Sequence, residues 1–116
     1  MHITTQHNTK SDVIHVAGDF LSEPDQSKFR DRVQDLVNRG SREIIIDLTG
    51  VHHINSCGLG ALVCALTTAK KADGDLALVG VDPAVRKLFA MTKLDTIFHV
   101  YTTPAEALSS MNEHAS

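Results

Sequence analysis

The strongest constraint on the fold is a run of three isoleucines, Ile44 to Ile46, between Glu43 and Leu48. Consecutive β-branched side chains favour an extended strand. An apolar run without polar interruption is typical of a strand that is buried on both faces. Such strands lie inside parallel sheets that are covered by helices, so the chain is expected to alternate strands with helices.

The rest of the chain shows this alternation. Further strands are predicted at residues 2–7, 12–17, 76–81 and 97–101, and helices are predicted to begin near Pro24, Ser56, Asp82-Pro83 and Pro104. Gly74 is expected to end the helix that begins near Ser56. The pattern predicts an α/β fold, with a small, open, mixed and mostly parallel sheet of four or five strands and four helices. The first two strands can pair antiparallel.

Length and composition agree with a single domain over residues 1–116. The chain has 42% hydrophobic and 22% charged residues, which is ordinary for a globular domain. Its formal net charge of −3 and its lack of tryptophan argue against a nucleic-acid binder. No apolar stretch reaches the roughly 20 residues of a membrane helix, and the first residues lack the features of a signal peptide. We therefore expect a cytoplasmic protein that binds neither nucleic acid nor membrane.

The segment from Asp47 to Gly60 carries the most chemical information, because it leads from the buried strand through a turn into a helix. Thr49-Gly50 is expected to break the strand. Ser56 is placed to be the N-cap of that helix, where its hydroxyl would accept hydrogen bonds from free N–H groups of the first turn. The glycines Gly58 and Gly60 leave this helix end unscreened, and a helix N-terminus favours a negative group such as a phosphate on Ser56. Local physics alone favours the simpler interpretation, a helix cap, over a phosphorylation site.

Several chemical motifs can be excluded in this segment. A dinucleotide-binding G-x-G-x-x-G would begin at Gly58 but meets Val63 at its last position. A hydrolase G-x-S-x-G has its second glycine at Gly58 but Ile54 at its first. No P-loop lysine follows the glycines, and none of the seven histidines has partners at the spacing of a zinc site. An enzyme with Ser56 or Cys57 as nucleophile would lack a motif-linked base, so neither catalysis nor a metal site is expected.

Two stretches of the chain are similar to the signature of STAS domains, and most of all to that of bacterial anti-sigma factor antagonists. The family pattern has a buried strand that ends in Asp-Leu-Ser-Gly-Val, followed by Asp-Ser-Ser-Gly-Leu-Gly at the start of a helix. The matching stretches here are Asp47-Leu48-Thr49-Gly50-Val51 and Asn55-Ser56-Cys57-Gly58-Leu59-Gly60. Residues 81–89, 92–98 and 104–108 also resemble the family, so the likeness covers nearly the whole chain.

The resemblance implies a regulatory binding protein rather than an enzyme, and one that needs no cofactor of its own. In the family, the unphosphorylated domain binds an anti-sigma factor that is also a serine kinase, and this binding releases the sigma factor. The kinase then phosphorylates the first serine of the motif, the antagonist is released, and a serine phosphatase resets the cycle. The matching acceptor is Ser56. The residues expected to form its site or the partner surface are Asp19, Asp47, Asn55, Cys57, Gly58, Leu59 and Gly60.

Three positions depart from the family pattern. Asn55 replaces the aspartate before the acceptor serine, which keeps the polar shape but removes a negative charge. If that aspartate positions the hydroxyl for the kinase, phosphorylation of this chain is expected to be slower. Cys57 replaces the second serine and is interpreted as a passive small residue, and Leu21 stands where the loop after the second strand usually has an acid.

A second interpretation keeps the fold and omits the switch. The domain would then be a constitutive binding module of a transporter or signalling complex, and Ser56 would only cap its helix. The two interpretations differ in the expected effect of one substitution. If the domain is a phosphorylation-controlled switch, Ser56→Asp would abolish partner binding. If it is a constitutive module, the same substitution would leave partner binding nearly intact.

Overall fold

The fold was obtained as a computed structural model, which describes residues 2–7, 11–18 and 23–115 without the side chains of Glu23, Cys57 and residues 111–115. Within these residues, five strands and four α-helices alternate, with one short 3-10 helix near the end. The elements are β1 (His2–His7), β2 (Ser11–Ala17), α1 (Glu23–Asn38), β3 (Glu43–Gly50), α2 (Ser56–Lys71), β4 (Asp75–Val79), α3 (Pro83–Met91), the 3-10 helix η1 (Leu94–Thr96), β5 (His99–Tyr101) and α4 (Pro104–Ala115).

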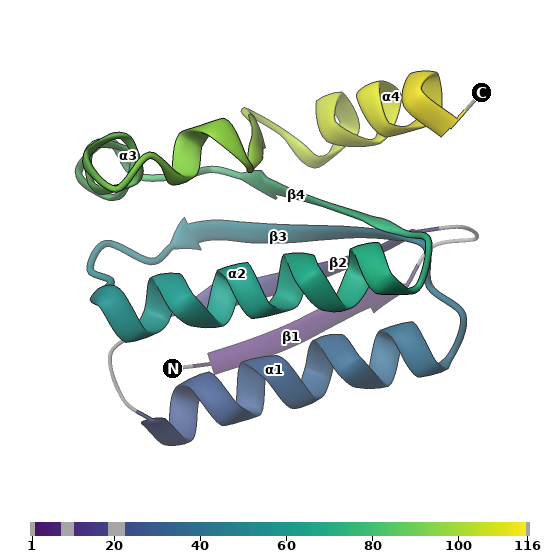
Figure 1. The fold of residues 1–116 in the computed structure, drawn as a ribbon, viewed down its shortest axis with the longest axis horizontal. Coiled ribbons are helices and arrows are strands. Elements are labelled where there is room, and N and C mark those ends of the chain that lie inside the picture. The colour runs from purple at the N-terminus through teal and green to yellow at the C-terminus, as the bar shows by residue number, and fades with distance from the viewer. Residues whose placement is uncertain (1, 8–10, 19–22, 116) are drawn as a thin grey trace.

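The five strands form one sheet in the order β1-β2-β3-β4-β5. β1 pairs antiparallel with β2, and the strands from β2 to β5 are parallel neighbours. Figure 1 shows α1 and α2 side by side along one face of the sheet, while α4 lies on the other side. This mixed, mostly parallel sheet with four helices confirms the predicted fold class.

β3 lies at the centre of the sheet and is buried on both faces, as the run of isoleucines predicts. Ile44, Ile45 and Ile46 are each 0% exposed. Ile44 and Ile46 belong to the large core that includes Phe29 of α1. Ile45 lies in a smaller core on the opposite face, together with Ala107 of α4. Because successive side chains of a strand point to opposite faces, a continuous apolar run fills both layers.

β3 continues further than predicted, since the strand does not stop at Thr49. Gly50 pairs with Ala17 of β2, and the Gly18 N–H donates a 3.0 Å hydrogen bond to the Gly50 carbonyl. A Cβ atom at position 50 would lie 3.0 Å from Ala17. The glycine therefore permits a close approach that extends the strand pairing, and the predicted break at this point is wrong.

The last strand is shorter than the predicted segment 97–101. β5 comprises only His99–Tyr101, and Ile97 before it has helical dihedral angles (φ −107°, ψ −20°). Phe98 is nevertheless only 4% exposed, and its ring stacks on Phe89 of α3 with centroids 5.8 Å apart. The apolar character of this segment thus reflects packing against α3 as well as strand pairing, which periodicity over so few residues does not distinguish.

The end of α2 falls next to Gly74, as predicted, but another residue adopts the left-handed conformation. Asp73 has φ +61°, and the Gly74 N–H donates a 2.8 Å hydrogen bond to the Ala69 carbonyl. A Cβ atom at position 74 would lie 2.8 Å from the carbonyl oxygen of Arg42. Glycine is required here because the chain passes close to the start of β3.

Candidate functional site

The predicted site lies at the edge of the sheet where the parallel strands end. At this edge, on the left of Figure 1, β3 leads through residues 51–55 into α2. Val51 is 0% exposed and Ile54 is half-buried, so apolar side chains hold the connection against the core. The chain then returns to the surface at Ser56.

Asn55, and not Ser56, is the N-cap of α2. Asn55 has extended dihedral angles (φ −104°, ψ −178°), and its Oδ1 accepts a 2.9 Å hydrogen bond from the N–H of Gly58. Its carbonyl accepts the first intrahelical hydrogen bond, from the N–H of Leu59 at 3.0 Å. The predicted capping role of Ser56 is therefore wrong. Asparagine and serine cap helices equally well, so adjacent Asn and Ser leave the boundary open by one residue in sequence.

Ser56 is consequently the first residue inside α2, and its side chain is exposed. Among the residues that the structure describes, none forms a hydrogen bond with its hydroxyl. The first turn of α2 contains no acidic residue, so no carboxylate competes for the positive end of the helix dipole. The hydroxyl is accessible, and a negative group attached to it would be electrostatically favourable at this helix end.

The motif residues after Ser56 divide into buried and exposed positions. Gly58 is buried and Leu59 is 5% exposed, so both face the core beneath the helix end. Gly60 is exposed, and a Cβ atom at this position would have no atom within 4 Å. The structure places Cys57 in the helix but does not describe its side chain, and Asp19 lies outside the described residues.

Asp47 is held in a hydrogen-bond network near the same end of β3. One carboxylate oxygen accepts hydrogen bonds from the backbone N–H of Thr49 at 2.9 Å and from its hydroxyl at 2.5 Å. The other carboxylate oxygen lies 2.8 Å from Nδ1 of His15 on β2. Strand alternation puts Asp47 on the face opposite Ile46, and no hydrogen bond joins Asp47 to Ser56 in the described part of the chain.

The network also sets the ionisation of Asp47. Partial burial by itself raises the pKa of the carboxyl, but the hydrogen bonds from Thr49 and His15 together outweigh this effect and hold the pKa below its ordinary value. Asp47 is therefore a carboxylate with structural partners. The two hydrogen bonds from Thr49 are those of a residue that caps a local turn.

A contact that sequence reasoning missed links the connection before α2 to the start of α3. Nδ1 of His52 lies 3.0 Å from Oδ2 of Asp82, and Oδ1 of Asp82 accepts a 2.9 Å hydrogen bond from the N–H of Ala84 as the N-cap of α3. Both hydrogen bonds lower the pKa of Asp82, and the one with His52 has the larger effect. The proline after Asp82 signals the cap, but residues 30 positions apart offer no spacing signal for their contact.

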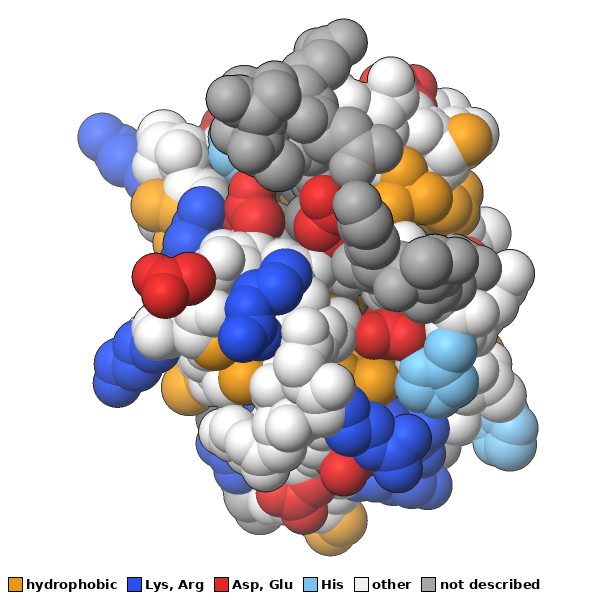
Figure 2. All heavy atoms as spheres, turned by 90° about the vertical axis from the view of Figure 1, so that its right-hand side faces the viewer, with side chains coloured by type: hydrophobic (Ala, Val, Ile, Leu, Met, Phe, Trp, Pro, Cys, Tyr) orange, Lys and Arg blue, Asp and Glu red, His pale blue; other side chains and the backbone are white. Residues whose placement is uncertain are grey.

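The end of the molecule opposite the candidate site has a surface of mixed charge. Figure 2 shows this face, on which acidic and basic side chains alternate and apolar side chains form only small patches. Lys70 at the end of α2 and Asp75 at the start of β4 form a 3.0 Å ion pair at this end. Over the described residues, no group of three or more His, Cys, Asp or Glu side chains could hold a metal ion, and no helix is long and apolar enough to cross a membrane.

The fold and the site together define the class. The chain belongs to the STAS domain family, whose sequence profile matches residues 2–107. A relative from Thermotoga neapolitana that is named as an anti-sigma factor antagonist is 32% identical over 77 residues, which cover 66% of this chain and 68% of that protein. The anti-sigma-B factor antagonist of Staphylococcus aureus is 34% identical over 61 residues, which cover 53% of this chain and 56% of that protein.

Solved structures share the fold. A Thermotoga maritima structure that is named as an anti-sigma factor antagonist has a TM-score of 0.84 and 25% identity, covering 95% of this chain and 94% of that chain. The anti-sigma factor antagonist SpoIIAA in its unphosphorylated form has a TM-score of 0.74 and 18% identity, and the match covers 96% of this chain and 98% of that chain. The murine anion transporter Slc26a9 has a TM-score of 0.77 and 17% identity, covering 93% of this chain and 18% of the transporter. The fold therefore occurs both in small antagonists and within a transporter.

Proposed function

We propose that the chain is an anti-sigma factor antagonist in a partner-switching pathway of the cytoplasm. In its unphosphorylated form it binds an anti-sigma factor that is also a serine kinase, and it is released when Ser56 is phosphorylated. A serine phosphatase restores the binding form. The chain itself acts as a binding module and performs no catalysis, and nucleotide enters only with the kinase.

The observation that carries this proposal is the position of Ser56. Its exposed hydroxyl has no hydrogen-bond partner among the described residues, and Asn55 already performs the capping function. A phosphate at this position therefore displaces no structural contact of the described chain. The anti-sigma factor antagonist names of the relatives agree with the proposed role.

Gly60 supports a partner surface around Ser56. Glycine inside a helix is less favourable than alanine by roughly 0.5–1 kcal/mol, and at position 60 no neighbouring atom requires it. A missing side chain next to an exposed helix start allows the backbone of a partner to approach closely. Gly60 and Asn55 are assigned to contact with the partner, while the buried Gly58 and Leu59 shape the site from beneath.

Phosphorylation would change the binding free energy without changing the fold. It adds a charge of about −1.5 to −2 at a point that the partner covers. Desolvation and repulsion of this charge need to supply only about 1.4 kcal/mol to weaken binding tenfold. We assign Asp19 and Asp47 to the partner surface as well, because the family resemblance marks both positions.

The second candidate is a constitutive STAS module of a transporter or signalling complex. The observation in its favour is the likeness of the fold to that of the Slc26a9 transporter, of which this chain covers 18%. In such a module the charge of residue 56 would not govern binding.

One paired experiment separates the two candidates. Wild-type, Ser56→Asp and Ser109→Asp proteins would be used as baits in lysate of the native host, and bound proteins would be identified by mass spectrometry. Ser109 is an exposed serine on α4, so Ser109→Asp introduces the same charge away from the site. The switch predicts that a serine-kinase-like protein binds to wild type and to Ser109→Asp but not to Ser56→Asp.

The kinase reaction gives an independent readout. Incubation of the purified complex with ATP should add one phosphate to the wild-type chain and none to Ser56→Ala. Equal retention of one partner by all three baits, together with no phosphate on Ser56, would establish the constitutive module instead.

A further inference from the structure

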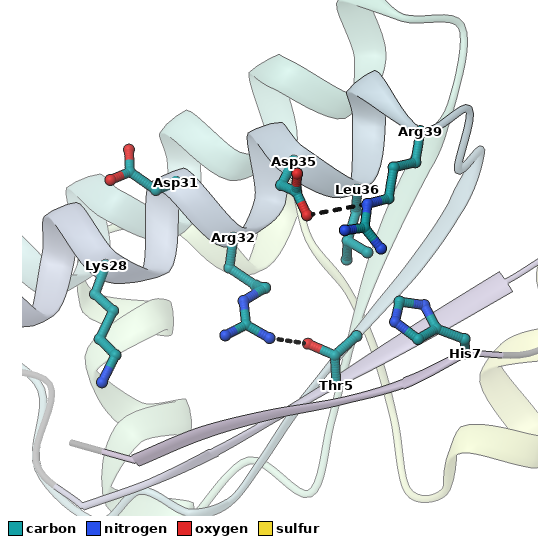
Figure 3. A pocket seen from close by; sticks show the side chains of 8 residues that line it. All are labelled: Thr5, His7, Lys28, Asp31, Arg32, Asp35, Leu36 and Arg39. Carbon is teal, nitrogen blue, oxygen red and sulfur yellow. Dashed lines mark hydrogen bonds and ion pairs between the residues drawn. The ribbon is translucent and has the colours of Figure 1, made fainter.

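A polar groove between α1 and β1 is formed by residues that play no part in the Ser56 site. Its volume is about 540 Å³, which lies within the usual range of small-molecule sites. The groove is lined by Thr5, His7, Lys28, Asp31, Arg32, Asp35, Leu36 and Arg39 (Figure 3).

One end of the groove carries positive charge without matching negative charge. Figure 3 shows Lys28 and Arg32 directed toward β1, while Asp31 points away from it. In the described part of the chain, no carboxylate forms an ion pair with either cation. Asp35 is paired with Arg39 at 3.3 Å, so its charge is compensated at the far end of the groove. This local excess contrasts with the formal net charge of −3 of the whole chain.

The two cations are one helical turn apart on α1. Like charges at positions i and i+4 of a helix repel each other and destabilise it. Lys28 and Arg32 nevertheless point into the same space (Figure 3). An anion between them would replace this repulsion by two charge-assisted interactions.

Arg32 is also fixed in position before any ligand binds. Its guanidinium donates a 2.7 Å hydrogen bond to the hydroxyl oxygen of Thr5 on β1. The guanidinium keeps four further N–H donors, and the hydroxyl proton of Thr5 remains available for another acceptor. Arg32 and Thr5 are both half-buried, so the groove holds a donor pair whose geometry is set by the contact between α1 and β1.

We propose that this end of the groove binds a phosphate group, with Lys28, Arg32 and Thr5 as its donors. Three separate donors match an anion with three terminal oxygens, and the guanidinium and the ammonium groups supply the compensating charge. Among the described residues of the lining, Leu36 alone is apolar, so the molecule that carries the phosphate is polar. The volume exceeds that of inorganic phosphate and accommodates a sugar-sized group. This site is independent of the function proposed for Ser56.

The test is a titration of the full chain followed by two-dimensional NMR. Inorganic phosphate and glucose 6-phosphate are the two probes, and sodium chloride at equal ionic strength is the reference. We expect saturable shifts that are confined to signals of β1 and α1 around Thr5, Lys28 and Arg32. Tighter binding of glucose 6-phosphate would identify an organic phosphate as the ligand, and equal binding would identify free phosphate.

Matched variants decide whether the groove is responsible. Lys28→Gln and Arg32→Gln should each weaken phosphate binding about tenfold or more, because each removes a charge-assisted hydrogen bond. Lys71→Gln removes the same charge from the exposed end of α2 and should leave binding unchanged. The proposal is overturned if neither probe gives saturable shifts beyond those of chloride, or if Lys71→Gln weakens binding as much as the groove variants.

Discussion

At the residue scale, the adjacent polar residues Asn55 and Ser56 have different tasks. The Asn55 side chain closes the helix start through the N–H of Gly58, and Ser56 projects into solvent. Aspartate is as good a cap as asparagine. The replacement of the family's aspartate by Asn55 therefore keeps the helix boundary and removes one negative charge beside the proposed phosphate. Sequence reasoning placed the cap one residue too late, at Ser56, because both residue types cap helices well.

The different tasks of Asn55 and Ser56 predict unequal effects on stability. Asn55→Ala should lower the free energy of unfolding by about 1 kcal/mol, because the N–H of Gly58 loses its acceptor. Ser56→Ala should change it by less than about 0.5 kcal/mol, since an exposed side chain without a described partner is removed. Urea denaturation of the two variants measures both values. Equal destabilisation by the two substitutions would show that Ser56 shares the capping role.

Asp47 makes the stability depend on pH in a defined direction. Its folded-state pKa lies below the ordinary value of 3.8, so the ionised carboxylate stabilises the fold at higher pH. This contribution is fully present above the unfolded-state pKa and is lost as the pH falls through the folded-state pKa. The stability difference between wild type and Asp47→Asn should therefore be largest near pH 7 and shrink below pH 3.8. Denaturation at several pH values measures this difference in stability. A difference that stays constant from neutral to acidic pH would contradict the lowered folded-state pKa of Asp47.

At the scale of elements, Gly60 inside α2 and Gly74 beyond its end show that similar sequence features have different causes. Gly60 stands in open space, whereas Gly74 has no room for a side chain beside Arg42. In the sequence both are glycines in or near a helix, and only the packing of neighbouring segments separates the two situations. The last strand gives a similar result, because the apolar segment around Phe98 serves the contact with Phe89 as well as the sheet.

Alanine substitutions at Gly60 and Gly74 should have opposite effects. Gly60→Ala should raise the free energy of unfolding by roughly 0.5–1 kcal/mol through better helix propensity. Gly74→Ala should lower it, because the new Cβ would lie 2.8 Å from the Arg42 carbonyl oxygen. Thermal denaturation measures both changes. If Gly60 contacts the partner as proposed, Gly60→Ala should also bind that partner more weakly although the protein is more stable.

A stabilised Gly60→Ala protein with unchanged partner affinity would remove Gly60 from the proposed surface. That result would not bear on the proposed phosphorylation of Ser56. The variant therefore tests one residue of the surface without testing the whole switch.

At the scale of the whole molecule, the sheet order determines which parts are most protected. β3 has strands on both sides and covered faces, while β1 and β5 are edge strands. The candidate site around Ser56 lies at the carboxyl edge of the sheet because α2 starts where β3 ends. The polar groove proposed to bind phosphate lies between α1 and the antiparallel edge strand β1. The two proposed sites thus use different elements of one sheet.

This arrangement predicts a gradient of backbone amide hydrogen exchange. Amides of Ile44 to Leu48 in β3 should exchange most slowly, with a free energy close to that of global unfolding. Amides of β1 and β5 should exchange faster through local opening, because each edge strand has a neighbour on one side only. Hydrogen exchange followed by NMR measures the gradient. Exchange of β1 as slow as that of β3 would show that the edge is protected by a contact outside the described residues.

The sequence by itself determined the alternation of strands and helices, the burial of Ile44 to Ile46 on both faces, and the start of a helix near Ser56, because periodicity and local motifs express these features directly. Tertiary structure decided that Asn55 is the cap, that His15 pairs with Asp47 across 32 positions, and that Lys28 and Arg32 face β1 without a described carboxylate partner. Hydrogen bonds and charge clusters between distant segments depend on strand register and helix placement. Those are properties of the packed molecule, and no spacing within one segment encodes them.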